Sequence, residues 1–319
     1  MGDSMTRYAS DLPDFDDLLA AAAQAKNLPA GIIEKDYYVV RVLKRLQEDL
    51  GGQFVLKGGT SLSKGWNLLE RFSEDLDLLF RREDGASALS ASELYRRMKN
   101  ADKCAAACLA LSQDQIRSTG DRSAPHRDSE FAYPRRHTPV SGMGGTIKLE
   151  MGARGGPNPS CPRPIRSFVT EHCEFTGNIG LADDLNSFDI ECLDVTRTFV
   201  EKLFAVHAAF ENNRALGRAR HYYDLFQMAG LDSVREFLGT PDYAEVLRDV
   251  SEVSRRYWPD RPLPPGGSFR ECGAIWPDEV ATRQLELNYQ RERELFFGRP
   301  PLLKNVLERL QILISETGI

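Results

Sequence analysis

The stretch from residue 54 to residue 80 restricts the fold of this chain more than any other part of the sequence. It opens with an apolar run, Phe54–Leu56, which is followed by Lys57 and stops at Gly58 and Gly59. This pattern indicates a buried strand that ends in a tight turn. Backbone N–H groups between glycines and a following helix favour an anion, and without Cβ atoms a phosphate can approach the chain. We expect this turn, with Lys57, to bind the phosphates of a nucleotide.

A short helix is expected to follow the glycines. Thr60 or Ser61 would cap this helix with a side-chain oxygen. Leu62, Trp66 and Leu69 are spaced so that they share one face of it. The backbone N–H groups of Thr60 and Ser61 complete the expected phosphate site.

A second strand is expected where Asp75 and Asp77 alternate with apolar residues. On a strand these two carboxylates point to one face, whereas Leu76, Leu78 and Phe80 point to the other. Two carboxylates beside a phosphate-binding turn suit a site in which Mg²⁺ ions serve phosphoryl or nucleotidyl transfer. An Asp-x-Asp pair alone is common on solvated strand faces. The combination with the glycine turn is what indicates an active site.

The complete pattern resembles the active-site motif GG[ST]…DxD of polymerase β-type nucleotidyltransferases. More narrowly, the segments KGGTSLSKGW and RFSEDLDL are similar to those of the AbiEii/AbiGii toxin family, which includes the MenT toxins. Three further segments carry the same resemblance: IIEKDYYVVRVLKRL at 32–46, EKLFA at 201–205 and RHYYDL at 220–225. With the C-terminal region, the resemblance extends from about Ile32 to Ile319.

The resemblance implies an α/β (α+β) fold, in which a polymerase β-type nucleotidyltransferase core is built on a mixed sheet. Residues 1–50 would form an N-terminal helical segment, 51–192 the core, and 193–319 a C-terminal helical region that completes the active site. Hydrophobic periodicity favours helices over 14–25, 29–50, 91–111 and 195–212, and strands over 146–151 and 188–192. Residues 113–140 are interpreted as hairpins with an exposed loop, 155–164 as a break, and 166–191 as irregular strands.

The resemblance also assigns roles to single residues. Asp75 and Asp77 would hold two Mg²⁺ ions. Lys202 would lie near the phosphates of the nucleoside triphosphate, and Asp224 would orient the site. Many relatives have an aspartate where this chain has His221, so a role for His221 does not follow from the resemblance.

Glu150 is the candidate for a third carboxylate, which polymerase β-type sites take from a neighbouring strand. The run TIKLEM at 146–151 alternates as a strand does, so that Glu150 shares a face with Lys148. The alternative is an ordinary half-exposed strand with a lysine and a glutamate on its outer face.

Two polar segments have open interpretations. Basic and aromatic residues alternate between 117 and 137, and Arg135 and Arg136 are the candidates for binding a single-stranded RNA end. Acidic residues in the same segment also fit a solvated loop. Glu34, Lys35 and Asp36 are either a solvated helix turn, or a place from which Lys35 or Asp36 approaches the nucleotide.

Composition restricts the remaining choices. The chain has 319 residues, of which 41% are hydrophobic and 28% charged, with a net charge of −6. A nucleic acid would therefore have to be bound by a local basic patch. The cysteines lack zinc-binding spacing, and no signal-peptide core or membrane-length apolar run is present. We expect a cytoplasmic protein that makes no use of a membrane.

The resemblance implies an enzyme that transfers a nucleoside monophosphate from a nucleoside triphosphate to RNA, in some members to the 3′ end of tRNA. It would be the toxin of a phage-defence toxin–antitoxin pair, would block translation, and would have a separate antitoxin protein as partner. A nucleotidyltransferase acting on a small molecule, as aminoglycoside-modifying enzymes do, or on a protein hydroxyl group remains an alternative. A nucleotide-binding module without catalysis is a further one, disfavoured by the paired aspartates together with Lys202.

Overall fold

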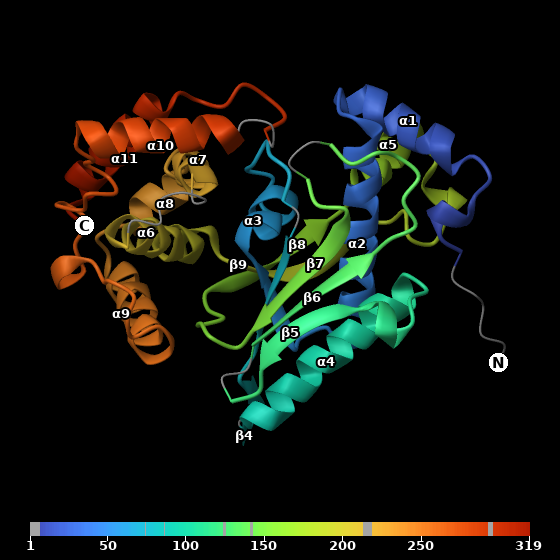
Figure 1. The fold of residues 1–319 in the computed structure, drawn as a ribbon, viewed down its shortest axis with the longest axis horizontal. Coiled ribbons are helices and arrows are strands. Elements are labelled where there is room, and N and C mark those ends of the chain that lie inside the picture. The colour runs from blue at the N-terminus through green and yellow to red at the C-terminus, as the bar shows by residue number, and fades with distance from the viewer. Residues whose placement is uncertain are drawn as a thin grey trace. The chain divides into compact units, whose positions relative to one another are not determined.

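The computed structural model describes residues 7–73, 75–85, 87–123, 126–140, 143–212, 219–292 and 296–319 of this mixed α/β chain (Figure 1). Two compact units are present. The sheet unit comprises 1–65, 73–153 and 161–192, and the helical unit comprises 66–72, 154–160 and 193–319. The chain thus enters the helical unit twice before it remains there from Leu193 onward. The three-part division expected from the resemblance stays a prediction.

A seven-stranded mixed sheet forms the centre of the sheet unit, in the order β5-β6-β7-β2-β1-β9-β8. In that order the strands are Arg117–Asp121, His126–Ala132, Thr146–Gly152, Asp75–Phe80, Phe54–Lys57, Phe188–Leu193 and Ser160–Ile165. β2 pairs antiparallel with β1 and parallel with β7. A small hairpin of β3 (Glu83–Asp84) and β4 (Ser87–Ala88) lies outside this sheet.

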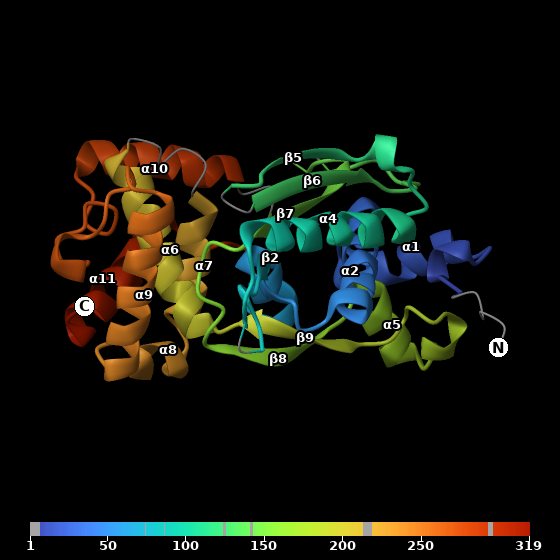
Figure 2. The same ribbon diagram turned by 90° about the horizontal axis from the view of Figure 1, so that it is seen from below.

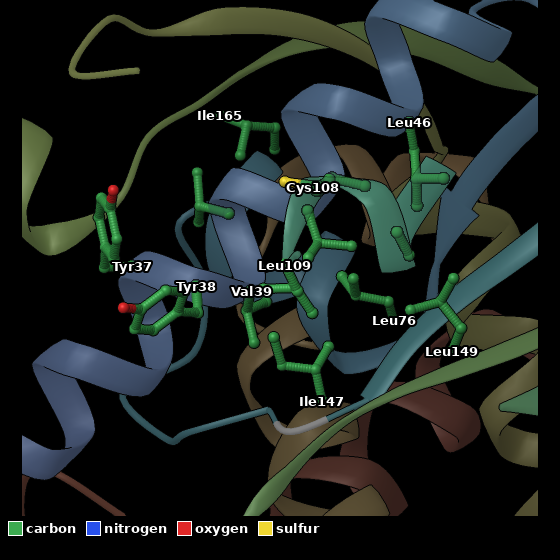
Figure 3. Close-up of a cluster of buried hydrophobic side chains, with 14 of the residues drawn as sticks. Tyr37, Tyr38, Val39, Leu46, Leu76, Cys108, Leu109, Ile147, Leu149 and Ile165 are labelled. Atoms are coloured by element: carbon green, nitrogen blue, oxygen red, sulfur yellow. The ribbon is translucent and has the colours of Figure 1, made fainter. Parts of the chain in front are cut away.

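One face of the sheet is apolar because the residues of its central strands alternate. Leu76, Leu78, Ile147 and Leu149 are fully buried on this face. α2 (Ala30–Leu50) and α4 (Ala91–Cys108) contribute the facing side chains, which Figure 3 shows interlocking with Leu76 and Leu149. Figures 1 and 2 show α4 alongside the β5–β6 hairpin. Burial of these side chains is the main source of stability that the sheet unit offers.

Two smaller helices extend this core around α2. α1 (Phe15–Lys26) packs on α2 and on α5 (Phe168–Thr176). The interpretation of 166–191 as irregular strands is wrong for α5. Its ends were readable, because Ser167 caps the helix by accepting from the Thr170 N–H and Gly177 ends it in the left-handed conformation. The interpretation of 155–164 as a break is likewise wrong for residues 160–164, which belong to β8.

Helices α6 to α11 make up most of the helical unit in the ranges that the structure describes. They are α6 (Val195–Glu211), α7 (Ala219–Met228), α8 (Asp232–Phe237), α9 (Pro241–Tyr257), α10 (Glu279–Arg291) and α11 (Leu303–Thr317). α7 packs on α6, α10 and α11, and α6 also packs on α8 and α9. Tyr222 of α7 donates a buried hydrogen bond to the Ala274 carbonyl. Within the described ranges, no helix combines the length and apolar character that crossing a membrane requires.

Candidate active site

The glycine turn and the aspartate pair are fitted to each other in space. Gly58 has φ = 70°, a backbone conformation that residues with a side chain rarely adopt. A Cβ at this position would lie 1.9 Å from Oδ2 of Asp77. The strand pairing explains this closeness, because Lys57 at the end of β1 lies opposite Asp77 on β2. Glycine at position 58 therefore serves both the turn and the carboxylate beside it.

The helix after the turn begins earlier and ends sooner than the sequence predicts. It consists of α3 (Gly58–Thr60) and a turn of wider helix, η2 (Ser61–Gly65), and no side chain caps it. Thr60 Oγ1 instead donates to the Asp75 carbonyl oxygen at 2.6 Å. The predicted capping role of Thr60 or Ser61 is wrong, since both lie inside the helix. The predicted face is wrong as well, because Trp66 and Leu69 follow its end.

Acidic side chains form a row across neighbouring strands. Asp75 and Asp77 are half-buried on β2, and their partners on the parallel strand β7 are Lys148 and Glu150 respectively. Side chains at paired positions of adjacent strands share a face. Glu150 therefore lies beside Asp77, and its role as a third carboxylate stays a prediction. Glu74, which precedes this strand in the quoted motif, lies outside the described residues.

Lys148 supplies positive charge within this acidic row. Its ammonium contacts the Glu150 carboxylate, two residues away on the same strand face. Burial would lower the pKa of Lys148, but Glu150, Asp75 and Asp128 outweigh burial and raise it. Lys148 thus stays charged and offsets the repulsion among the carboxylates. The sequence placed Lys148 on this face, but gave it no role.

The carboxylate oxygens of Asp75 and Asp77 suit a Mg²⁺ ion that takes its other ligands from a substrate. Mg²⁺ prefers carboxylate oxygens, and proteins usually bind it through one or two carboxylates together with substrate phosphates. Asp75 and Asp77 offer such a pair. Because Gly58 has no Cβ, the Asp77 carboxylate can lie directly beside the turn. Among the described residues, no three His, Cys, Asp or Glu side chains form a ready-made metal site. A Mg²⁺ ion held by this pair would have the nucleotide phosphates among its remaining ligands.

A second charged cluster lies within the helical unit. Asp224 of α7 is fully buried and receives both Nε and Nη2 of Arg71 at 2.7 Å. Lys202 of α6 places Nζ 2.8 Å from the second Asp224 oxygen and 3.1 Å from Nδ1 of His221. The cationic side chains of Arg71 and Lys202 thus share the Asp224 carboxylate. Asp224 therefore orients Lys202, the residue that the resemblance associates with the phosphates.

The charge state of this cluster follows from its partners. Burial alone would raise the pKa of Asp224, but Arg71 and Lys202 outweigh burial and hold it well below its usual range. Arg71 is absent from the sequence-based site, although it stands in the quoted motif RFSEDLDL. Nothing in the sequence indicates its partner, because 153 positions separate Arg71 from Asp224.

The two candidate arginines differ in their surroundings. Arg135 is exposed and its guanidinium lies over Gly145, where a Cβ would come within 2.7 Å of it. Arg136 instead bonds to the Ser10 carbonyl and pairs with Asp16 at 3.3 Å. Both side chains are exposed, and the RNA-binding role of both stays a prediction.

The charged residues at the start of α2 are buried, so the interpretation as a solvated helix turn is wrong. Glu34 and Lys35 are 0% exposed, and Asp36 is 1% exposed. The reason is that each of them bonds to a different part of the sheet unit. Asp36 pairs with Lys64 in η2, directly after the glycine turn.

Comparison with known proteins agrees with this geometry. The class is that of the nucleotidyltransferases: the glycine turn and acidic strand lie in a chain that matches a nucleotidyltransferase family model over residues 41–309. The chain belongs to that family, AbiEii, described as "Nucleotidyl transferase AbiEii toxin, Type IV TA system". Membership implies a nucleotide substrate and an antitoxin partner. None of the curated proteins compared with the chain is significantly similar to it.

Proposed function

We propose that this protein transfers a nucleoside monophosphate from a nucleoside triphosphate to RNA, with the 3′ end of tRNA as the acceptor. Loss of a usable tRNA end would block translation, which suits a toxin acting in phage defence. The observation that carries the proposal is the fit between Gly58 and Asp77, with Glu150 paired to Asp77 across the sheet. The glycine turn, which would bind phosphates, is therefore directly beside the row of carboxylates.

The proposed reaction is a displacement at phosphorus. The acceptor hydroxyl oxygen forms a bond to the α-phosphorus, the bond from that phosphorus to the β-phosphate breaks, and pyrophosphate leaves. Mg²⁺ held by Asp75 and Asp77 would lower the pKa of the acceptor hydroxyl and offset the charge of the leaving group. Little covalent chemistry is asked of the protein itself, so positioning and electrostatics dominate.

The chain's own residues have distinct tasks in this proposal. Lys57, Gly58, Gly59 and the N–H groups of Thr60 and Ser61 seat the triphosphate. The family resemblance assigns Lys202 to the neutralisation of phosphate charge, and within the helical unit Asp224 keeps its ammonium in place. Glu150 supports the two aspartates as the third carboxylate of the row.

The acceptor is tested directly by labelling. Purified protein is incubated with each α-³²P-labelled triphosphate and Mg²⁺, and with total RNA, purified tRNA, an aminoglycoside or a protein extract in separate reactions. We expect label on tRNA, and loss of that label after removal of its 3′-terminal nucleotides. Label on the aminoglycoside or protein alone would replace RNA by one of the other acceptors. Asp189→Ala is the control variant and should label the same acceptor as wild type, because Asp189 is an exposed carboxylate elsewhere on the sheet.

A further inference from the structure

Three consecutive charged residues of α2 are buried, and each bonds to other parts of the sheet unit. The Glu34 carboxylate accepts from the backbone N–H groups of Arg136 and His137 at 2.6 and 2.9 Å. Lys35 Nζ donates to the Gly144 carbonyl oxygen at 2.7 Å. These two residues therefore hold the loop before β7 at two points.

Asp36 anchors a different part of the unit, the segment that follows the glycine turn. One of its carboxylate oxygens contacts Lys64 Nζ, and the other accepts from the Phe168 N–H at 2.7 Å. The same Lys64 ammonium lies 3.6 Å from the centre of the Phe168 ring. Lys64 is thus enclosed by a carboxylate and an aromatic face, both of which favour a cation.

This enclosure decides what Lys64 does. A lysine six residues after Gly58 is at first sight a candidate for binding phosphates. Its side chain is only 11% exposed and that of Asp36 only 1%, so neither charge is balanced by water. Removing one member would leave the other as an unpaired buried charge, which is strongly unfavourable. Lys64 would then reach water only if η2 moved with it.

We propose that Asp36 is a positioning residue for the nucleotide: by holding Lys64, it fixes residues 58–65 in the conformation that binds the triphosphate. Lys64 is then the anchor of the turn and does not contact phosphate. This inference rests on the proposed function of the turn. It assigns to α2 a role in nucleotide affinity that the sequence motif of glycines and aspartates does not contain.

The test compares wild type with Asp36→Asn, Lys64→Met and Lys64→Arg. Affinity for the α,β-methylene analogue of each triphosphate is measured by calorimetry with Mg²⁺, and hydrogen exchange of the amides at 58–65 is followed in parallel. We expect Asp36→Asn and Lys64→Met to bind the analogue roughly 10-fold or more weakly, the scale seen when groups that orient a binding residue are lost. Exchange at 58–65 should accelerate. Lys64→Arg keeps the charge and should recover most of the affinity.

Asp102→Asn is the matched control. Asp102 is also a buried helical aspartate, in α4, and its partner is Arg127 on β6. The control should lower the thermal midpoint as Asp36→Asn does, yet bind the analogue within about twofold of wild type. Equal loss of affinity in the control would reduce Asp36 to a general stabilising role and overturn the inference, as would wild-type affinity in both Asp36→Asn and Lys64→Met.

The outcomes also separate this inference from the proposed function. If wild type binds an analogue and the Asp36 and Lys64 variants bind equally well, only the role of Asp36 is refuted. If wild type binds none of the analogues in the presence of Mg²⁺, the nucleotide site itself is refuted, and the inference with it. Lys64→Met keeps the inference testable if Asp36→Asn fails to fold, because the methionine retains the apolar stem against Phe168.

Discussion

The carboxylate of Asp77 occupies the space in which a side chain at position 58 would lie: a Cβ on Gly58 would be 1.9 Å from Oδ2 of Asp77. Gly58 directly follows strand β1 and Asp77 lies on β2, so the β1–β2 pairing, which places Lys57 opposite Asp77, brings them together. The glycine turn and the acidic strand are therefore a single structural requirement. A side chain added at position 58 must displace the Asp77 carboxylate.

Gly58→Ala should abolish transfer, because the new methyl group displaces the Asp77 carboxylate. We expect activity to fall by about 10²-fold or more, the scale for loss of a preorganised electrostatic group. Gly52→Ala is the control, since Gly52 has φ = 82° and open space around its Cβ position. Both changes strain the backbone, so both should lower the thermal midpoint. Loss of labelling in both variants would contradict the predicted collision.

Asp75→Ala or Asp77→Ala should abolish transfer and leave the fold intact. Both side chains lie on the half-buried face opposite Leu76 and Leu78, so their removal costs no core contact. Transfer should fall by about 10²-fold or more, and chelation of Mg²⁺ should have the same effect on wild type. The measurement is labelling by purified variants with matching circular dichroism spectra. Near-normal labelling by Asp77→Ala would refute the assignment.

Arg71→Met should destabilise the helical unit by about 3–5 kcal/mol, since it leaves Asp224 buried with one cation fewer. Arg235→Met is the control, because the Arg235–Glu316 pair is about half exposed on both sides. An exposed pair of this kind contributes about 0–1 kcal/mol. Urea unfolding of the two variants measures the difference. Equal stability losses would show that the Asp224 cluster is not the buried electrostatic unit described above.

The depressed pKa of Asp224 predicts how the free energy of unfolding depends on pH. This pKa is depressed in the folded protein, so the unfolded chain binds more protons once the pH falls below about 4, and the free energy of unfolding declines. Lys202→Met should raise the pKa of Asp224 in the folded protein. As the pH falls, the free energy of unfolding of this variant should therefore stop declining at a higher pH than that of wild type. Urea unfolding from pH 2 to 7 should give curves that converge at the acid end. Parallel curves throughout this range would contradict the prediction.

The two loop arginines should separate RNA binding from stability. Arg135→Ala should flatten the salt dependence of RNA affinity by about 0.7, the slope of one phosphate contact on a single strand. Arg136→Ala should mainly lower the thermal midpoint, because its guanidinium is bonded to Ser10 and Asp16. Affinity for the nucleotide analogue should be unchanged in both. Identical salt slopes for wild type and Arg135→Ala would leave this loop as a solvated surface.

Local features of the fold were readable from the sequence wherever one period dominates. The alternation around Asp75 and Asp77 predicted both the strand and its acidic face, and the helices α2 and α6 follow their apolar stripes. α5 is not predicted because its nine residues are too short a stretch to show a clear helical period, although Ser167 and Gly177 mark its ends.

Relationships between distant segments were not readable in the same way. The alternation of TIKLEM places Glu150 on a polar strand face, but its pairing with Asp77 follows only from the β2–β7 register. Arg71 and Asp224 meet across 153 positions, and Asp36 and Lys64 are joined by burial that no local pattern encodes. Charged residues in a helix read as solvated, since most of them are. Only the fold reveals which ones have exchanged water for a partner.

The path of the chain through its two units limits how the protein can be divided. Residues 66–72 and 154–160 belong to the helical unit, although sheet-unit segments surround them in the sequence. A fragment that stops at Cys192 would retain Arg71 without its acceptor Asp224, and one that starts at Leu193 would retain Asp224 without Arg71. No single cut yields both halves intact. A cut at this boundary therefore separates the two partners of a buried ion pair, and we expect neither fragment to be as stable as the same segment in the whole chain.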